Sequence, residues 1–129
     1  MPFRTSTSAT PTIPVTRRAA VAALAALLPF CALAHHGWSE YDSNTLLTLT
    51  GVIEEAGYEH PHGHVKLMTP AKTWMAVLAP PSRMENRGLT KDMMKIGVTA
   101  TVEGYPNRSK PEEMRAERIT IAGKTVELR

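Results

Sequence analysis

The sequence is poor in cysteine and phenylalanine, and the few that it has lie near its start. Of the 129 residues one is cysteine and two are phenylalanine, and Phe3, Phe30 and Cys31 all fall within residues 1–34. If that segment is removed, the rest of the chain can form no disulfide, thiolate nucleophile or cysteine-ligated zinc site. The length also limits the chain to one small domain.

Residues 35–129, the greater part of the chain, have a formal net charge of zero. Three of the 15 basic residues (Arg4, Arg17 and Arg18) and none of the 12 acidic residues lie in residues 1–34, which leaves 12 of each sign in residues 35–129. A neutral domain has no electrostatic footprint for nucleic acid or anionic lipid, so we expect no nucleic-acid partner. No Ser-His-Asp spacing, phosphate-binding loop or paired-carboxylate motif indicates an enzyme.

Residues 1–34 have the pattern of a signal peptide. Arg17 and Arg18 precede an uncharged apolar run, and Ala32-Leu33-Ala34 matches the small-x-small pattern of a signal-peptidase site. The apolar run reaches roughly 16 residues, short of the ~20 that span a bilayer, so we expect no stable membrane anchor after cleavage. We predict a periplasmic or secreted bacterial protein that begins at residue 35. The paired arginines leave the Sec and twin-arginine export routes both open.

Residues 35–129 read as an all-β domain with one short helix. Apolar residues alternate with polar ones in several segments, and Pro81 and Gly88 flank a helical stretch. Gly51 suggests a bulge or tight bend in the first strand. A second helical turn is expected at residues 90–94. The expected strands span residues 46–53, 64–69, 73–78, 98–105, 115–121 and 125–128, and the expected helix spans residues 81–87.

This order of elements predicts an OB-like barrel of five or six strands in Greek-key order, with the helix between strands three and four. A β-sandwich is the alternative, but it would need more strands. The residues that we expect to be buried are Val65, Leu67, Val98, Val102, Ile119 and Ile121.

Several short motifs occur in a distinctive order. They are His35-His36-Gly37-Trp38, Glu40-Tyr41-Asp42, Leu49-Thr50-Gly51-Val52-Ile53, Pro61-His62, Trp74 and Val102-Glu103-Gly104-Tyr105. In this combination residues 35–129 resemble an uncharacterised family of small secreted bacterial proteins, the domain of unknown function 6152. The resemblance supports His35, His36 and His62, whereas His60 and His64 replace an asparagine and an aromatic residue of the family pattern. It implies no activity.

All five histidines lie in two short clusters, and imidazole is a ligand that zinc, copper and nickel favour. His60, His62 and His64 are spaced by two, so in an extended segment their side chains share a face. The alternative is turn chemistry, in which their ring nitrogens bond to the backbone.

Cleavage after Ala34 would make His35 the N-terminus. A terminal histidine offers its α-amine and one ring nitrogen to the same ion, and a distant histidine can complete the T-shaped copper arrangement called a histidine brace. The α-amine has a pKa of about 7.7–8.0, so a metal can displace its proton near neutral pH. We expect His35 and His62 to contribute most, His64 to support them, and His36 and His60 to matter less. Trp38 and Tyr41 would anchor the N-terminal segment on the barrel.

Two further groups of side chains allow two interpretations each. The methionines of the mature domain can bind Cu(I) or fill a core that lacks phenylalanine, and core packing is favoured. The aromatic residues can form a ligand-binding face or pack into the core and rim, and packing is again favoured. These aromatic residues are Trp38, Tyr41, Trp74 and Tyr105.

The sequence therefore supports two functional hypotheses. The first is a periplasmic module that binds copper or another transition metal, as a carrier or accessory protein. The second is a non-enzymatic OB-like module with structural histidines that binds a periplasmic partner protein or a small ligand. An oxidative copper enzyme would also need an open metal position and a substrate platform, and the domain is small for both.

Overall fold

The computed structural model describes residues 7–12 and 37–129. The chain divides into two units, Met1–Cys31 and Ala32–Arg129. Of the first unit, residues 7–12 are described and have no regular secondary structure. In these two described ranges no helix is long and apolar enough to cross a membrane.

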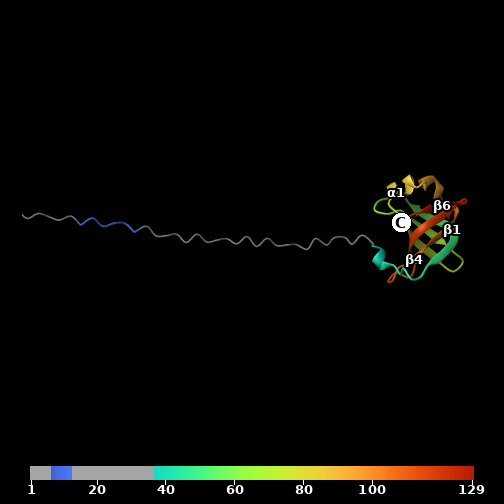
Figure 1. Cartoon of the computed structure of the whole chain (residues 1–129), viewed down its shortest axis with the longest axis horizontal. Helices are drawn as coiled ribbons and strands as arrows, with labels where there is room; N and C mark the ends of the chain where they lie inside the picture. The colour runs from blue at the N-terminus through green and yellow to red at the C-terminus, as the bar shows by residue number, and fades with distance from the viewer. Residues whose placement is uncertain (1–6, 13–36) are drawn as a thin grey trace, which may run out of the picture. The chain divides into compact units, whose positions relative to one another are not determined.

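The second unit is a β-barrel with short helical segments (Figure 1). The 3-10 helix η1 (Trp38–Glu40) precedes the first strand, and α1 (Pro81–Asn86) and the 3-10 helix η2 (Lys91–Met93) lie between the third and fourth strands. The strands are β1 (Leu47–Gly57), β2 (His64–Met68), β3 (Thr73–Val77), β4 (Thr99–Pro106), β5 (Glu113–Ile121) and β6 (Lys124–Glu127).

Pairing between distant strands closes the barrel. β1 pairs in antiparallel fashion with β2 on one side and β4 on the other, β2 pairs with β3, and β4 pairs with β5. The circle closes where β3 pairs in parallel with the start of β5, from Met75↔Glu113 to Val77↔Arg115. β6 is an outer strand paired with the second half of β5. This confirms the predicted OB-like barrel with one helix between β3 and β4.

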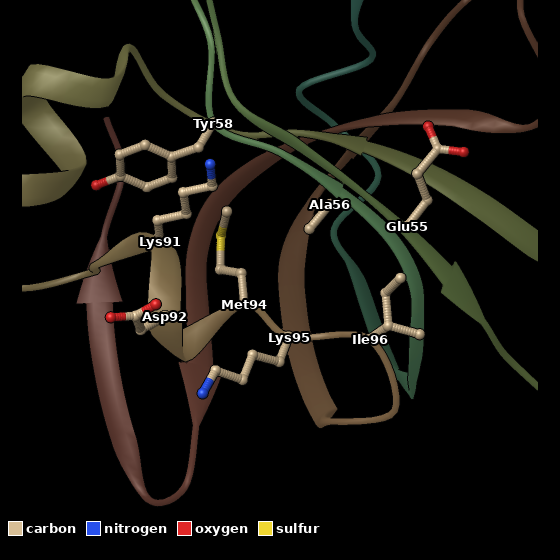
Figure 2. Close-up of a pocket in the computed structure, with 8 residues that line it drawn as sticks. All are labelled: Glu55, Ala56, Tyr58, Lys91, Asp92, Met94, Lys95 and Ile96. Carbon is tan, nitrogen blue, oxygen red and sulfur yellow. The ribbon is translucent and has the colours of Figure 1, made fainter.

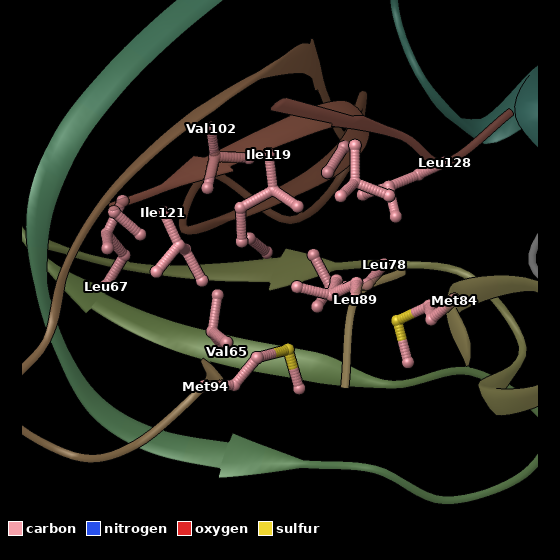
Figure 3. Packing of buried hydrophobic residues seen from close by; sticks show 14 of the residues in the cluster. Val65, Leu67, Leu78, Met84, Leu89, Met94, Val102, Ile119, Ile121 and Leu128 are labelled. Carbon is pink, nitrogen blue, oxygen red and sulfur yellow. The ribbon is translucent and has the colours of Figure 1, made fainter. Parts of the chain in front are cut away.

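The core lies inside the barrel and follows the alternation of the strands (Figure 3). Five of the six residues predicted to be buried are at most 4% exposed, and Val98 is half-buried against them. Met84, Met94 and Met114 are also buried, which confirms the core-packing interpretation for these three methionines. Full burial of one such side chain is worth about 1.5–3 kcal/mol.

Of the bulge or tight bend suggested at Gly51, the bulge is not there, because the register shift of β1 lies between Ile53 and Glu55. Gly51 pairs regularly with Ala100 of β4. Its lack of a side chain has another cause: a Cβ there would collide with the carbonyl group of Met68. A glycine inside a strand can thus mark the close approach of a neighbouring backbone as well as a bulge.

Hydrogen bonds join the helix α1 and the residue that ends it to β6 and the residues after it. Basic side chains donate to carbonyl groups at the end of the chain: Arg83 Nη1 to Leu128 O at 3.3 Å, and Arg87 Nη1 to Glu127 O at 2.9 Å. In the other direction, Nζ of Lys124 in β6 donates a 2.9 Å hydrogen bond to Gly88 O. Gly88 has φ +86°, so it occupies the left-handed conformation that commonly ends a helix.

Candidate functional site

The segment after Gly37 is docked onto the turn between β4 and β5. Tyr41 forms a β-bridge with Asn107 and is 2% exposed. Its hydroxyl group donates to Glu113 Oε1 at 2.6 Å. The backbone adds two bonds, from Asp42 N to Pro106 O and from Arg108 N to Glu40 O, both 2.9 Å. Tyr41 is therefore an anchor of this segment, as the sequence indicated.

Burial raises the pKa of Tyr41 far above its ordinary value of 10.0, and the hydrogen bond to Glu113 raises it further. A buried phenolate would lie beside the Glu113 carboxylate, so the neutral hydroxyl is strongly favoured. Tyr41 thus acts as a neutral hydrogen-bond donor that fixes the position of the segment.

Two guanidinium groups contact the ring of Trp38. Arg115 Cζ is 4.8 Å and Arg129 Cζ is 4.6 Å from the centroid of its ring, distances typical of cation–π contacts. Tyr105 meets the same ring edge-on, with centroids 6.2 Å apart. Together with His62, described next, Trp38, Tyr105, Arg115 and Arg129 form what we call the Trp38 cluster. Its two arginines differ: Arg115 is 6% exposed, whereas the Arg129 side chain is 57% exposed.

His62 belongs to this cluster because its Nε2 lies 3.3 Å from Nη2 of Arg115. A guanidinium group has donors and no acceptor, so in this hydrogen bond Nε2 of His62 is the acceptor. Burial lowers the pKa of Arg115 from its ordinary value, and the nearby positive charge of Arg83 lowers it further.

The structure does not bring the three loop histidines together. β1 ends at Gly57 and β2 begins at His64, so residues 58–63 are not a strand and their side chains do not alternate as predicted. His60 is exposed at a bend. His64 Nε2 lies 3.4 Å from Glu55 Oε1, while His62 faces Arg115. In the part of the chain that the structure describes, no three His, Cys, Asp or Glu side chains are grouped as metal ligands.

His35 and His36 lie outside the described residues, and so does the predicted cleavage site after Ala34. The brace of His35 with His62 therefore stays a prediction. What the structure adds is the position of Trp38, three residues after His35, in the same cluster as His62.

The four aromatic residues considered for a ligand-binding face do not form one. Tyr41 is buried, and Trp74 packs against the core with Lys72 Nζ 4.0 Å from its ring centroid. Trp38 and Tyr105 contact each other in the cluster. Sequence reasoning missed Arg115, because a charged residue in an alternating strand normally faces solvent, whereas Arg115 is buried beside Met114 and Ala116.

The fold and this cluster define a small OB-like barrel on which two aromatic rings, two arginines and one histidine are in contact. The chain belongs to the family of unknown function DUF6152, whose model matches residues 22–114. This confirms the resemblance seen in the motifs. No curated protein matches the chain.

Two solved structures show limited similarity to part of this chain. One is the crystal structure of TiaS in complex with an isoleucine tRNA and ATP, 19% identical with a TM-score of 0.47. The other is the ZRD-deleted mutant of TiaS in complex with agmatine, 18% identical with a TM-score of 0.46. Each match covers 68% of this chain but only 19% and 25% of the respective TiaS chains.

Proposed function

We propose that this chain is an exported protein of the bacterial periplasm that binds copper or another transition metal through His35 and His62. One observation supports this proposal: Trp38, which follows His35-His36-Gly37 directly, lies in the same cluster as His62. A brace needs the N-terminus folded back onto the barrel, and Tyr41 holds the adjoining segment there.

The chain between His35 and Trp38 is long enough for His35 to reach His62. Extended chain spans at most about 3.3–3.6 Å per residue, so His35 can lie up to about 10–11 Å from Trp38. The Trp38 ring is 4.8 Å from Cζ of Arg115, and Nη2 of Arg115 is 3.3 Å from His62 Nε2. The α-amine and ring of His35 can therefore reach His62 without moving Trp38.

Arg115 opposes metal binding at His62. A metal ion needs a ring nitrogen with a free lone pair, and the Nε2 lone pair accepts the Arg115 donor. The positive guanidinium group also repels a cation at this distance. Metal binding through Nε2 would therefore require Arg115 to release His62, which lowers the affinity for metal.

The test uses untagged mature protein that begins at His35, titrated with Cu(II) by calorimetry and electron paramagnetic resonance. One extra N-terminal glycine blocks the brace, and His62→Gln removes the distant ligand. We expect each change to weaken Cu(II) binding more than about tenfold, His64→Gln and His36→Ala to weaken it modestly, and His60→Gln least. Unchanged affinity in the glycine-extended protein would exclude the brace.

Export is tested separately, by the intact mass of protein recovered from the periplasm. A mass that corresponds to residues 35–129 is expected. A chain that retains residues 1–34, or carries lipid on Cys31, has no free α-amine at His35 and would contradict both the predicted cleavage and the brace.

The second candidate is a non-enzymatic OB-like module with structural histidines, which binds a periplasmic partner protein or a small ligand. The hydrogen bond from Arg115 to His62 favours it, because that bond gives His62 a structural role without metal. In this case His62→Gln lowers the free energy of unfolding of metal-free protein, and Cu(II) raises the stability of neither protein. Stabilisation of the wild type alone by Cu(II) would favour the first candidate.

A further inference from the structure

The backbone beside His62 is tied to the barrel. Gly63, the next residue, is bonded in both directions to the residues that follow β3. Its N–H donates to Ala79 O at 2.9 Å, and its carbonyl group accepts from Leu78 N at 2.8 Å. Gly63 is also buried. These bonds fix the backbone from which the His62 ring extends toward Arg115.

The backbone of Arg115 is fixed as well. Arg115 pairs with Val77 of β3 on one side and with Tyr105 of β4 on the other. Gly104 allows a close approach here, because a Cβ at that position would collide with the carbonyl group of Arg115. Any movement of the guanidinium group must therefore come from its side-chain torsions and not from a shift of the strand.

The contact between these two side chains uses a nitrogen that a metal could bind. Nη2 of Arg115 lies 3.3 Å from Nε2 of His62, and a guanidinium group can only donate. Arg115 is 6% exposed, so little water can replace His62 as the acceptor when the bond breaks. Loss of a hydrogen bond by a buried charged group is costly, and an ion that binds His62 must overcome this cost.

Metal binding breaks this bond whichever ring nitrogen is used. In a neutral imidazole one nitrogen carries a proton and the other is the acceptor. If Nε2 of His62 binds the metal, its lone pair is used directly. If Nδ1 binds the metal, Nε2 carries the proton and can no longer accept from Arg115. The metal and the Arg115 hydrogen bond therefore exclude each other at both nitrogens.

We propose that Arg115 is an internal competitor for the metal at His62, which closes the site in the metal-free protein and sets the metal concentration at which the site fills. This inference rests on the proposed function, because it concerns the regulation of the same site. The coupling is reciprocal: the affinity for metal that Arg115 removes equals the affinity of Arg115 for His62 that the metal removes.

The first test compares two arginines that contact the same ring. Arg115→Met and Arg129→Met each remove a guanidinium group from Trp38, whose ring centroid is 4.8 Å from one Cζ and 4.6 Å from the other. Of the two, Arg115 is the one bonded to His62. In calorimetric titrations of untagged mature protein with Cu(II), we expect Arg115→Met to strengthen binding about tenfold and Arg129→Met to change it less than about twofold. Equal effects would overturn the proposal.

A second control lies in a cleft between the end of β1 and the η2 segment, which has a volume of about 370 Å³ (Figure 2). Lys91 lines this cleft, and none of the residues that line it belongs to the Trp38 cluster. Lys91→Met removes one positive charge from an exposed position, so it should leave the affinity for Cu(II) unchanged. A gain equal to that of Arg115→Met would mean that net charge alone sets the affinity, and would overturn the proposal.

The second test needs no variant, so it holds even if Arg115→Met does not fold. In ¹⁵N-labelled, metal-free mature protein, Nε2 of His62 should give the NMR shift of an unprotonated acceptor. Zn(II), a diamagnetic probe for imidazole, should move the guanidinium signals of Arg115 as it binds. Zn(II) bound at His62 with unchanged Arg115 signals would overturn the proposal. Failure of wild type and Arg115→Met alike to bind Cu(II) would contradict the proposed function, and this inference with it. Cu(II) binding that Arg115→Met does not strengthen would contradict this inference alone.

Discussion

The barrel interior and the Trp38 cluster are held together by different kinds of contact. The interior is a continuous set of buried apolar side chains contributed by every strand and by α1. The cluster joins one residue from each of five separate segments through cation–π contacts, an edge-on ring contact and one hydrogen bond. Apolar burial is non-directional and follows area, whereas these polar contacts depend on distance and angle.

The difference shows how stability and local order are divided in this domain. When the domain unfolds, a buried leucine exposes a large apolar area to water, whatever its orientation in the fold. Trp38 is only half-buried, and the residues that hold it come from far along the chain. The interior should therefore set the free energy of unfolding, and the cluster should set where the N-terminal segment lies.

The largest effect is expected in the interior. Leu67→Ala removes a fully buried side chain that faces the centre of the barrel, and we expect a loss of about 2–5 kcal/mol in urea unfolding. Ile96→Ala is the matched control, because Ile96 is 74% exposed and its loss should change stability by less than about 0.5 kcal/mol. Similar losses in the two variants would mean that Leu67 does not belong to a packed core.

The interior was predictable because each strand repeats its pattern within a few residues. Val65 and Leu67 alternate on β2, as do Ala100 and Val102 on β4, and both pairs are buried. The strand ends were predicted less well. β1 runs to Gly57 and β5 starts at Glu113, because pairing with β2 and parallel pairing with β3 extend them. Those partners are distant in sequence, so no local pattern reports them.

The candidate site was predictable only in part, for the same reason. Tyr41 was expected as an anchor because an ordered N-terminal segment needs an apolar contact to offset its loss of entropy, although its partner Glu113 is 72 positions away. The sequence could place the loop histidines on one face only for an extended segment, and residues 60–63 are not part of a strand. Arg115 was missed because a charged residue in a strand normally faces solvent, and its contact with Trp38 exists only in the folded chain.

A smaller effect is expected from Tyr41→Phe, at the border between the two regions. The variant keeps the ring in the core and loses the bond to Glu113, which is worth about 1.5–3 kcal/mol for a charged acceptor. Because the pKa of Tyr41 is raised in the folded state, its stabilising contribution is complete below pH ~10 and is lost as the pH rises further. Urea unfolding from pH 8 to 11.5 should therefore show a stability gap between wild type and variant that narrows above pH 10. A gap independent of pH would show that Tyr41 ionises equally in both states.

The smallest expected effect is the difference between the coupling free energies of Trp38 with Arg115 and with Arg129. Double-mutant cycles that combine Trp38→Leu with Arg115→Met or with Arg129→Gln measure each coupling free energy by urea unfolding. Arg129 is 57% exposed, so its coupling to Trp38 should be about 0.5–1 kcal/mol, whereas the buried Arg115 should reach about 2 kcal/mol. Salt at 1 M shortens the Debye length to about 3 Å, less than the 4.6 Å between Arg129 Cζ and the ring centroid, so the Arg129 coupling should fall and the Arg115 coupling should persist. Equal couplings with equal salt dependence would mean that burial does not distinguish the two contacts, and that the cluster is an exposed surface feature throughout.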